Sequence, residues 1–227
     1  MASGSLDAFV RAVEEIADLQ RADRTPPGGT PLEPDITRVV GRASVVLLTS
    51  HFERYIYAVN EEAAGVINTA GMAGSLLPEK LRLIHSSSIV DAMLETDWVN
   101  RASKLREFME LEGWLWSKGQ SGVLDHKRLL TWMKAPTPTN LVRYYRHWEI
   151  EDIFSAITRA AHTKTDLRLK LQELVDKRNN IAHGDPNTEA TRSDVDGYRD
   201  AALRFCERSD RQLARALARI LTCPQPW

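Results

Sequence analysis

Residues 174–185 read LVDKRNNIAHGD and end an amphipathic helix that carries an arginine on its apolar side. At about 100° per residue, the apolar positions of this helix form one stripe, made of Leu167, Leu171, Leu174, Val175, Ile181 and Ala182. Arg178 lies at the centre of that stripe. Because an unpaired buried charge is strongly disfavoured, an arginine in such a place is usually either paired or functional.

His183 follows five residues after Arg178, and Gly184 and Pro186 then stop the helix. Histidine is the side chain that most readily exchanges a proton near neutral pH. On a continuous helix, residues five apart point about 140° away from each other. Arg178 and His183 are therefore not expected to converge within one straight helix, whereas Asn179 and His183, four apart, share a face.

This segment resembles the Arg-x(4-6)-His motif of the HEPN superfamily, with Asn179 as the polar residue after the arginine. The string RNNIAHG at residues 178–184 is close to the form in the RiboL-PSP-type HEPN branch. A long apolar helical pattern from residue 35 to about 67 contains a Ser-x-Phe-Glu-x-Tyr core at residues 50–55 and resembles the first bundle helix of that branch. The resemblance is best over about residues 38–60 and 165–220, and the middle of the chain is unassigned by it.

Helical periodicity predicts most of the remaining elements. We expect helices over about residues 5–21, 35–67, 78–95, 97–113, 166–183 and 193–222, with one or two short helices within 141–154. Ser193 is the expected N-cap of the last helix. Almost no alternating strand pattern is present, so the fold class is all-α: a HEPN-type helical bundle with additional helices inserted between the first long bundle helix and the motif helix.

Two interruptions rich in proline suggest the domain organisation. Residues 1–34 are expected to form an N-terminal helix followed by a Pro/Gly linker, and residues 35–227 a HEPN helical domain with an inserted helical region at about 78–140. The first helix could dock loosely or exchange between protomers. Four tryptophans between Trp98 and Trp132 are expected to be core or interface anchors rather than platforms for base stacking.

Composition excludes several classes of protein. The net charge of −1 over 227 residues gives no general basic field, so any RNA contact must be local. Cys206 and Cys223 form neither a disulfide framework nor a zinc-binding spacing, and no apolar run is long enough to span a membrane. We therefore expect a cytoplasmic protein. No metal-ligand pattern, Gly-rich phosphate loop or nucleophile elbow is present, so no metal and no cofactor are predicted.

The resemblance implies a metal-independent endoribonuclease, in which the ribose 2′-hydroxyl attacks the adjacent phosphate and leaves 2′,3′-cyclic phosphate and 5′-hydroxyl ends. His183 and Arg178 are the expected catalytic residues: histidine can move the protons, and a guanidinium matches phosphate charge with two hydrogen bonds. Asn179 and Asn180 are supporting residues. Glu53 is a candidate partner of Arg178, either orienting it for catalysis or forming a structural ion pair with it.

The divergent directions of Arg178 and His183 leave two solutions open. Gly184 could let the last turn unwind, or the site could be composite across a two-fold dimer, as the resemblance implies. The expected partners are therefore RNA (tRNA or mRNA), a second copy of the chain, and an antitoxin or defence-system protein, with no membrane. Arg143, Tyr145 and Arg146 mix cations with an aromatic ring and are the predicted RNA-binding residues, although a solvated face with core aromatics gives the same pattern.

Two other functions remain open. One is a noncatalytic HEPN module that binds RNA or a nucleotide, or serves as a dimerisation or partner scaffold. The other is a plain structural bundle, in which Arg178 is an ordinary buried ion pair. The expected setting of a nuclease is a toxin or a phage-defence effector, which follows from the resemblance alone.

Overall fold

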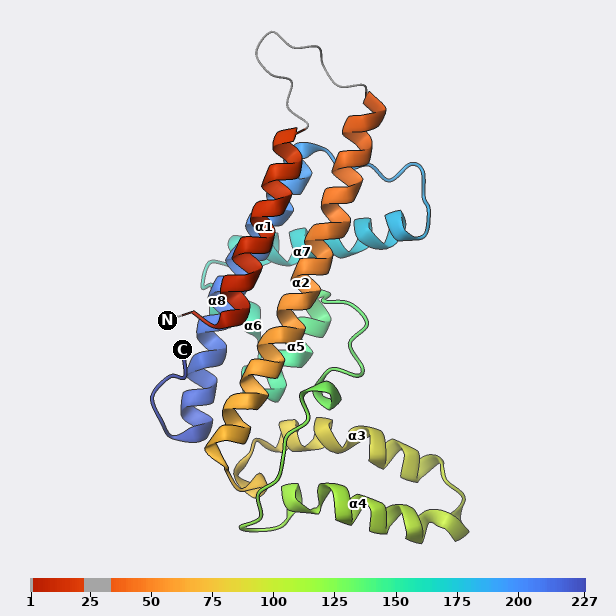
Figure 1. The fold of residues 1–227 in the computed structure, drawn as a ribbon, viewed down its shortest axis with the longest axis vertical. Helices are drawn as coiled ribbons and strands as arrows, with labels where there is room; N and C mark the ends of the chain where they lie inside the picture. Colours follow the sequence, from red (N-terminus) through yellow and green to blue (C-terminus); the bar gives the residue numbers. More distant parts are fainter. Residues whose placement is uncertain (1, 23–33) are drawn as a thin grey trace.

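The computed structural model describes residues 2–22 and 34–227, and over these residues it contains eight α-helices and no β-strand (Figure 1). The all-α prediction is confirmed. Short 3-10 turns lie at Gly74–Leu76 (η1), Trp98–Asn100 (η2) and His126–Leu129 (η3). The helices are α1 (Gly4–Ala22), α2 (Pro34–Ala70), α3 (Glu79–Glu95), α4 (Arg101–Trp116), α5 (Pro138–His147), α6 (Ile153–Ile157), α7 (Ala161–Ala182) and α8 (Arg192–Leu221).

Helix α2 is the central element of the bundle. Its apolar positions recur every three or four residues, and Val45, Leu48, Phe52, Tyr55 and Val59 are all fully buried. Helices α1, α7 and α8 pack against it. Figure 1 shows α1, α2 and α8 along the long axis of the molecule, with α7 crossing α2. The predicted central position of this helix is confirmed.

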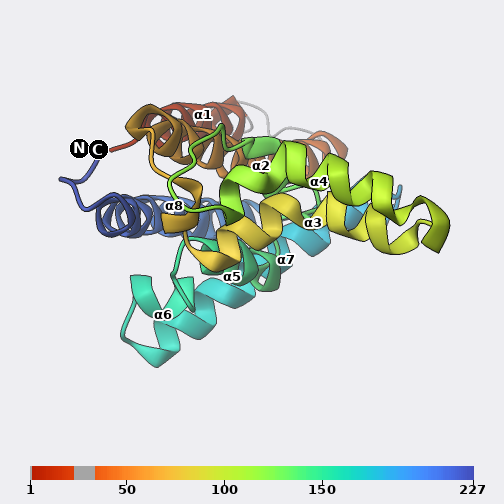
Figure 2. The ribbon, with the colours of Figure 1, turned by 90° about the horizontal axis from the view of Figure 1, so that it is seen from below.

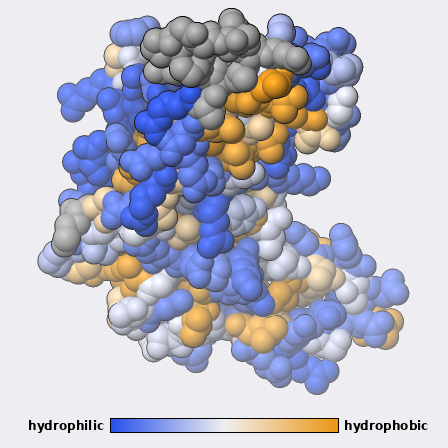
Figure 3. All heavy atoms as spheres, turned by 45° about the horizontal axis from the view of Figure 1, so that its top comes forward, coloured by the Kyte–Doolittle hydropathy of each residue, from blue (hydrophilic) through white to orange (hydrophobic). Residues whose placement is uncertain are grey.

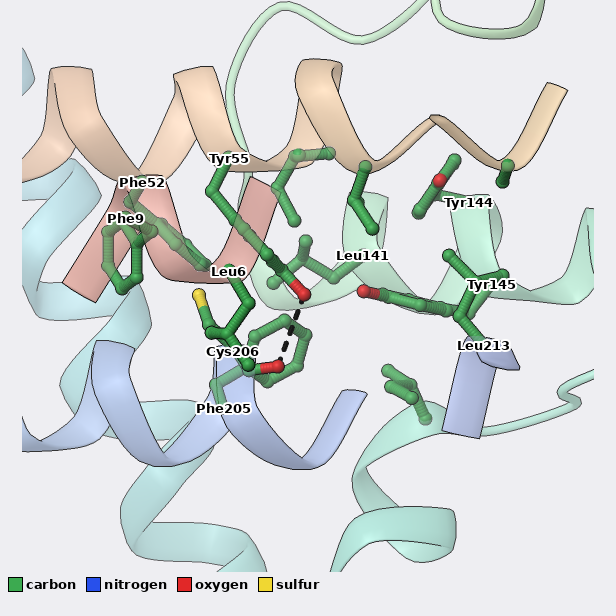
Figure 4. Close-up of a cluster of buried hydrophobic side chains, with 14 of the residues drawn as sticks. Leu6, Phe9, Phe52, Tyr55, Leu141, Tyr144, Tyr145, Phe205, Cys206 and Leu213 are labelled. Atoms are coloured by element: carbon green, nitrogen blue, oxygen red, sulfur yellow. Dashed lines mark hydrogen bonds between the residues drawn. The ribbon is translucent and has the colours of Figure 1, made fainter. Parts of the chain in front are cut away.

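Aromatic side chains fill the core between α2 and α8. The Phe205 ring packs edge-on against Phe52 at a centroid distance of 5.8 Å and tilted against Phe154 at 5.4 Å. The hydroxyl of Tyr55 donates to the carbonyl of Cys206 at 3.1 Å (Figure 4). A buried tyrosine hydroxyl usually has such a partner, and this bond fixes the position of α2 along α8.

Helix α1 packs along α2 and α8 rather than standing apart. Leu6, Phe9, Val13 and Ile16 are buried, and the carboxylate of Glu62 on α2 accepts the first backbone N–H groups of α1. The predicted Pro/Gly linker lies outside the described residues. The proposed division of the chain at residue 34, and exchange of α1 between protomers, stay predictions.

Helices α3 and α4 form a hairpin that projects from the bundle (Figures 1 and 2). At its base, the buried carboxylate of Glu112 accepts from His85 Nδ1 at 2.8 Å and from Ser86 at 3.0 Å, and it pairs with Arg128 of η3. His85 Nε2 accepts the backbone N–H of Asp125 at 3.0 Å, which assigns the His85 proton to Nδ1. This closed network joins α3, α4 and η3.

The tip of the hairpin exposes apolar side chains. Trp98 is 80% exposed and Val99 is 87% exposed. Trp114 and Trp132 are partly buried against the core. Trp98, which lies in the 3-10 turn joining the two helices, is therefore not a core residue. The other expected position, at an interface, stays a prediction.

Several helix boundaries differ from the prediction. Helix α4 continues through Gly113 to Trp116, and α7 begins at Ala161, five residues before the predicted start. The N-cap of α8 is Thr191 rather than Ser193, because Thr191 and Asp194 accept each other's backbone N–H in a capping box. None of the helices in the described ranges is long and apolar enough to cross a membrane.

Candidate functional site

The motif helix α7 buries one side and turns its C-terminal end outward. Leu167, Leu171, Leu174 and Val175 are buried, whereas Ile181 is only partly buried and Ala182 is exposed. The predicted stripe therefore reaches the surface at its last turn, and Ala182 is not a core residue. Arg178 lies in this transition, with its side chain 31% exposed. The guanidinium is held by protein atoms and remains open to solvent on one side.

Two neighbours orient the Arg178 guanidinium. Its Nη1 donates to Oδ1 of Asn179 at 3.1 Å, and its Nη2 lies 3.4 Å from the carboxylate of Glu53 on α2. The structure thus brings together three of the predicted site residues. The predicted contact between Glu53 and Arg178 is confirmed.

Glu53 lies in a partly desolvated place. Burial raises the pKa of its carboxyl above the usual range, and the nearby Arg178 charge offsets only part of that rise. Glu53 also lines a cavity of about 40 Å³ together with Tyr57 and Lys134. The Tyr57 hydroxyl donates to the carbonyl of Met133 at 3.1 Å and so fixes this segment against α2. An exposed lysine, Lys134, therefore lies at the edge of the site.

His183 is the residue after the last turn of α7. Its backbone N–H donates to the carbonyl of Asn179 at 2.9 Å, so it keeps the helical register. Gly184 then adopts a φ of +81°, and the N–H of Asp185 donates to the carbonyl of Asn180 at 3.0 Å. The predicted stop at Gly184 is confirmed. The His183 imidazole is exposed, and within the described ranges it forms no hydrogen bond or ion pair.

No hydrogen bond joins Arg178 and His183 in the described chain, and the backbone bond from His183 to Asn179 leaves the last turn wound. Of the two predicted solutions, unwinding at Gly184 is not what this chain adopts. The divergence of the two side chains, which the spacing of five predicts on a wound helix, stays a prediction.

The loop after the motif is tied to α2 by a residue that the sequence analysis missed. Arg42 donates through Nη1 to the carbonyls of Asp185 at 2.8 Å and Thr188 at 2.7 Å. The Asp185 carboxylate accepts from the Thr188 hydroxyl at 2.5 Å and from the Asn187 backbone at 2.9 Å. These bonds, the Thr188 hydroxyl first, hold the pKa of Asp185 below its usual range.

The predicted RNA-binding residues separate in the structure. Arg143 and Arg146 are exposed on α5, where Arg143 stacks on Trp132 at 4.0 Å and Arg146 donates to the carbonyl of Glu151 at 2.9 Å. Tyr145 is fully buried, with its ring 6.1 Å from that of Phe205. The prediction that Tyr145 contacts RNA is therefore wrong, because its ring is enclosed by the core.

Asn180, the other predicted supporting residue, is exposed, and only its backbone carbonyl takes part in the helix stop. Among residues 2–22 and 34–227, no cluster of three or more His, Cys, Asp or Glu side chains could hold a metal ion. The site's described polar groups are thus an oriented arginine, a histidine without a partner in these ranges, and a carboxylate behind the arginine.

Comparison with known families gives one finding. The family model described as RiboL-PSP-HEPN matches residues 7–215, which run from α1 to α8 and include Glu53, Arg178 and His183. No curated protein and no solved structure matched the chain.

Proposed function

Because the chain belongs to the RiboL-PSP-HEPN family, we propose that it is a metal-independent endoribonuclease. The observation that carries this proposal is the state of two motif side chains. Arg178 is held in one orientation yet keeps a solvent-facing side, and the exposed His183 imidazole has no partner among the described residues. A purely structural role would not require Arg178 to keep a solvent-facing side, and a helix-capping role would not require the His183 imidazole to be exposed without a partner.

The chemistry assigns one role to each residue. The His183 imidazole takes the proton from the ribose 2′-hydroxyl as that oxygen attacks the adjacent phosphorus, or returns a proton to the leaving 5′-oxygen. Arg178 donates two hydrogen bonds to the phosphate oxygens, on which negative charge grows in the transition state. Glu53 and Asn179 fix the guanidinium plane, and the exposed Asn180 is a proposed supporting residue.

In the proposed composite site, a two-fold dimer brings Arg178 and His183 from the two protomers together. In support, Ile36, Val39, Leu47 and Tyr57 of α2 are all more than 40% exposed, and on a helical wheel they fall within about 80° of arc. Glu53 lies about 40° from the edge of this stripe on the same wheel. A second copy packed on the exposed α2 stripe would therefore meet the first beside Arg178.

The remaining partners are proposed on the same basis. The substrate is a tRNA or an mRNA, contacted by the exposed cations Lys134, Arg143 and Arg146. An antitoxin or defence-system protein controls the activity, in the cytoplasm, in a toxin or phage-defence setting. The net charge of −1 fits a local RNA contact rather than general nucleic-acid binding.

A second candidate function is a noncatalytic module that binds RNA or a nucleotide, or a dimerisation and partner scaffold. The Glu53 carboxylate favours it, since it lies 3.4 Å from the guanidinium and neutralises part of the charge that a phosphate would meet. In that function Arg178 contributes affinity only, and removal of His183 leaves RNA intact and RNA binding unchanged.

Incubation of the purified protein with total RNA in EDTA tests the proposal. We expect the wild type to cleave RNA and to leave 2′,3′-cyclic phosphate ends, and His183→Ala and Arg178→Ala to be inactive. His162→Ala is the matched control, because His162 is an exposed histidine at the other end of α7. Intact RNA with all four proteins, at concentrations where light scattering finds a dimer, would refute the nuclease.

Light scattering also tests the interface. The wild type is expected to have the mass of a dimer, and Leu47→Glu that of a monomer, because the substitution places a charge in the α2 stripe between Val39 and Tyr57 along the helix axis. Leu169→Glu is the control, since Leu169 is an exposed leucine on α7 outside the stripe. A monomeric wild type at micromolar concentration would remove the composite site.

A further inference from the structure

We propose that Arg42 is the positioning residue that sets the direction of the His183 side chain, by fixing the loop after the motif to α2. This inference rests on the proposed function for its catalytic meaning. Its structural content, that α2 holds the backbone on the C-terminal side of His183, can be tested without RNA.

The hydrogen bonds of Arg42 are aimed at the backbone that leaves His183. The acceptors, the carbonyls of Asp185 and Thr188, are two and five residues after the histidine, at 2.8 and 2.7 Å from Nη1. Hydrogen bonds from a charged donor are stronger than those between neutral groups. One guanidinium therefore fixes both ends of the turn formed by residues 185–188.

The turn has its own internal bonds, so it moves as a unit. Asp185 accepts from Asn187 and Thr188 through its carboxylate, and its N–H donates to the carbonyl of Asn180 in α7. Gly184 is the only residue between His183 and this unit, and its φ of +81° sets the direction in which the chain turns. A shift of the turn relative to α2 therefore rotates the backbone of His183 directly.

A close contact one residue earlier on α2 fixes the same loop at its other end. A Cβ added to Gly41 would lie 2.1 Å from the carbonyl oxygen of Ala190. The backbone of α2 thus lies so close to the loop that only glycine fits at this position. Gly41 and Arg42 together clamp the loop from Asp185 to Ala190 between α7 and the N-cap of α8.

Arg38, one turn earlier on α2, provides a matched comparison. It reaches the same loop with a single hydrogen bond of 3.5 Å to the carbonyl of Pro186, and its side chain is 41% exposed. A bond of that length is weak. Arg38→Met and Arg42→Met therefore remove the same charge near the loop. Only Arg42→Met also removes the two short hydrogen bonds to the carbonyls of Asp185 and Thr188.

The experiment compares Arg42→Met, Arg42→Lys, Gly41→Ala and Arg38→Met in the full chain, by amide hydrogen exchange and by the imidazole resonances of His183 in ¹H–¹⁵N spectra. With Arg42→Met, we expect the amide of Asn187 to exchange roughly tenfold faster or more, as for loss of charge-assisted bonds in a local opening. The His183 resonances shift. Gly41→Ala gives the same shift by a different perturbation, Arg42→Lys restores part of the wild-type spectrum, and Arg38→Met resembles the wild type.

RNA cleavage separates this inference from the proposed function. If the wild type cleaves RNA, Arg42→Met lowers kcat and leaves KM unchanged, because Arg178 and its neighbours stay in place. If no form cleaves RNA but the His183 resonances respond as described, the clamp stands and the nuclease fails. Unchanged exchange and His183 resonances in both Arg42→Met and Gly41→Ala, with folded proteins by circular dichroism, would overturn the inference.

Discussion

The ion pair between Arg178 and Glu53 allows a structural arginine to be distinguished from a functional one. The two side chains are 31% and 23% exposed, and their charged atoms are 3.4 Å apart. An exposed pair contributes about 0.2–1 kcal/mol, whereas removing one partner of a fully buried pair costs about 3–5 kcal/mol. Because this pair is half-buried and longer than an ideal charge-assisted bond, we expect a coupling energy of about 1 kcal/mol.

The assay is urea unfolding of Arg178→Met, Glu53→Gln and the double variant at pH 7. Arg178→Met removes the positive charge that lowers the pKa of Glu53 and leaves the effect of burial, so that pKa rises further. The expected loss of stability in this variant is about 1–2 kcal/mol. Its RNA cleavage falls at least about a hundredfold, as for loss of a donor to a charged transition state.

Arg168→Met is the control for this experiment. Arg168 lies on the same helix, pairs with Asp152 at 2.9 Å, and has a side chain 39% exposed. A similar loss of stability with no effect on cleavage is expected. A loss above about 3 kcal/mol in Arg178→Met, with cleavage reduced only in proportion to unfolded protein, would make Arg178 a structural residue and refute the reasoning.

Three further predictions concern the site and the core. His183→Ala should change the free energy of unfolding by less than about 0.5 kcal/mol but reduce cleavage by about 10²–10⁴, measured on one preparation. Burial, with Arg143 and Lys80, lowers the pKa of His147 to about 4. As the pH falls below 6.5, His147 is protonated in the unfolded chain before it is protonated in the folded protein. The free energy of unfolding therefore falls by about 3 kcal/mol between pH 6.5 and pH 4. Urea unfolding should show a smaller fall in His147→Phe. Phe205→Ala should cost about 3–5 kcal/mol in urea unfolding.

Much of the fold follows from periodicity. The spacing of Val45, Leu48, Phe52 and Tyr55 predicts a central helix, and these residues are fully buried. The same reasoning places Leu171 and Leu174 in the core, which the structure confirms, and Arg178 at the centre of the apolar stripe. In the structure Arg178 lies where that stripe reaches the surface. Glu53 could be proposed as its partner because it is a carboxylate on the predicted central helix, and the contact is confirmed.

Other features carry no mark in the sequence. Arg42 binds two backbone carbonyls, which every residue possesses, so no residue type at positions 185 and 188 identifies them as acceptors. Basic and aromatic residues lie next to each other in the sequence of α5, but Arg143 and Arg146 are exposed whereas Tyr144 and Tyr145 are buried. Only the packing of Tyr145 against Phe205 decides that its ring is core. The sequence predicts Ser193 as the N-cap of α8, whereas the reciprocal bond with Asp194 makes Thr191 the N-cap.

The motif alone does not determine the site, because two residues of α2, Arg42 and Glu53, hold the motif at its two ends. Arg42 and Glu53 are eleven residues apart, which is close to three helical turns, so they lie on the same face of α2 at a separation of about 16 Å. One fixes the backbone after His183, and the other fixes the guanidinium of Arg178. Since α2 is a continuous helix over Pro34–Ala70, it carries these two anchors on one rigid element. The relation between His183 and Arg178 is therefore set by the spacing on α2 as much as by the spacing of five within the motif.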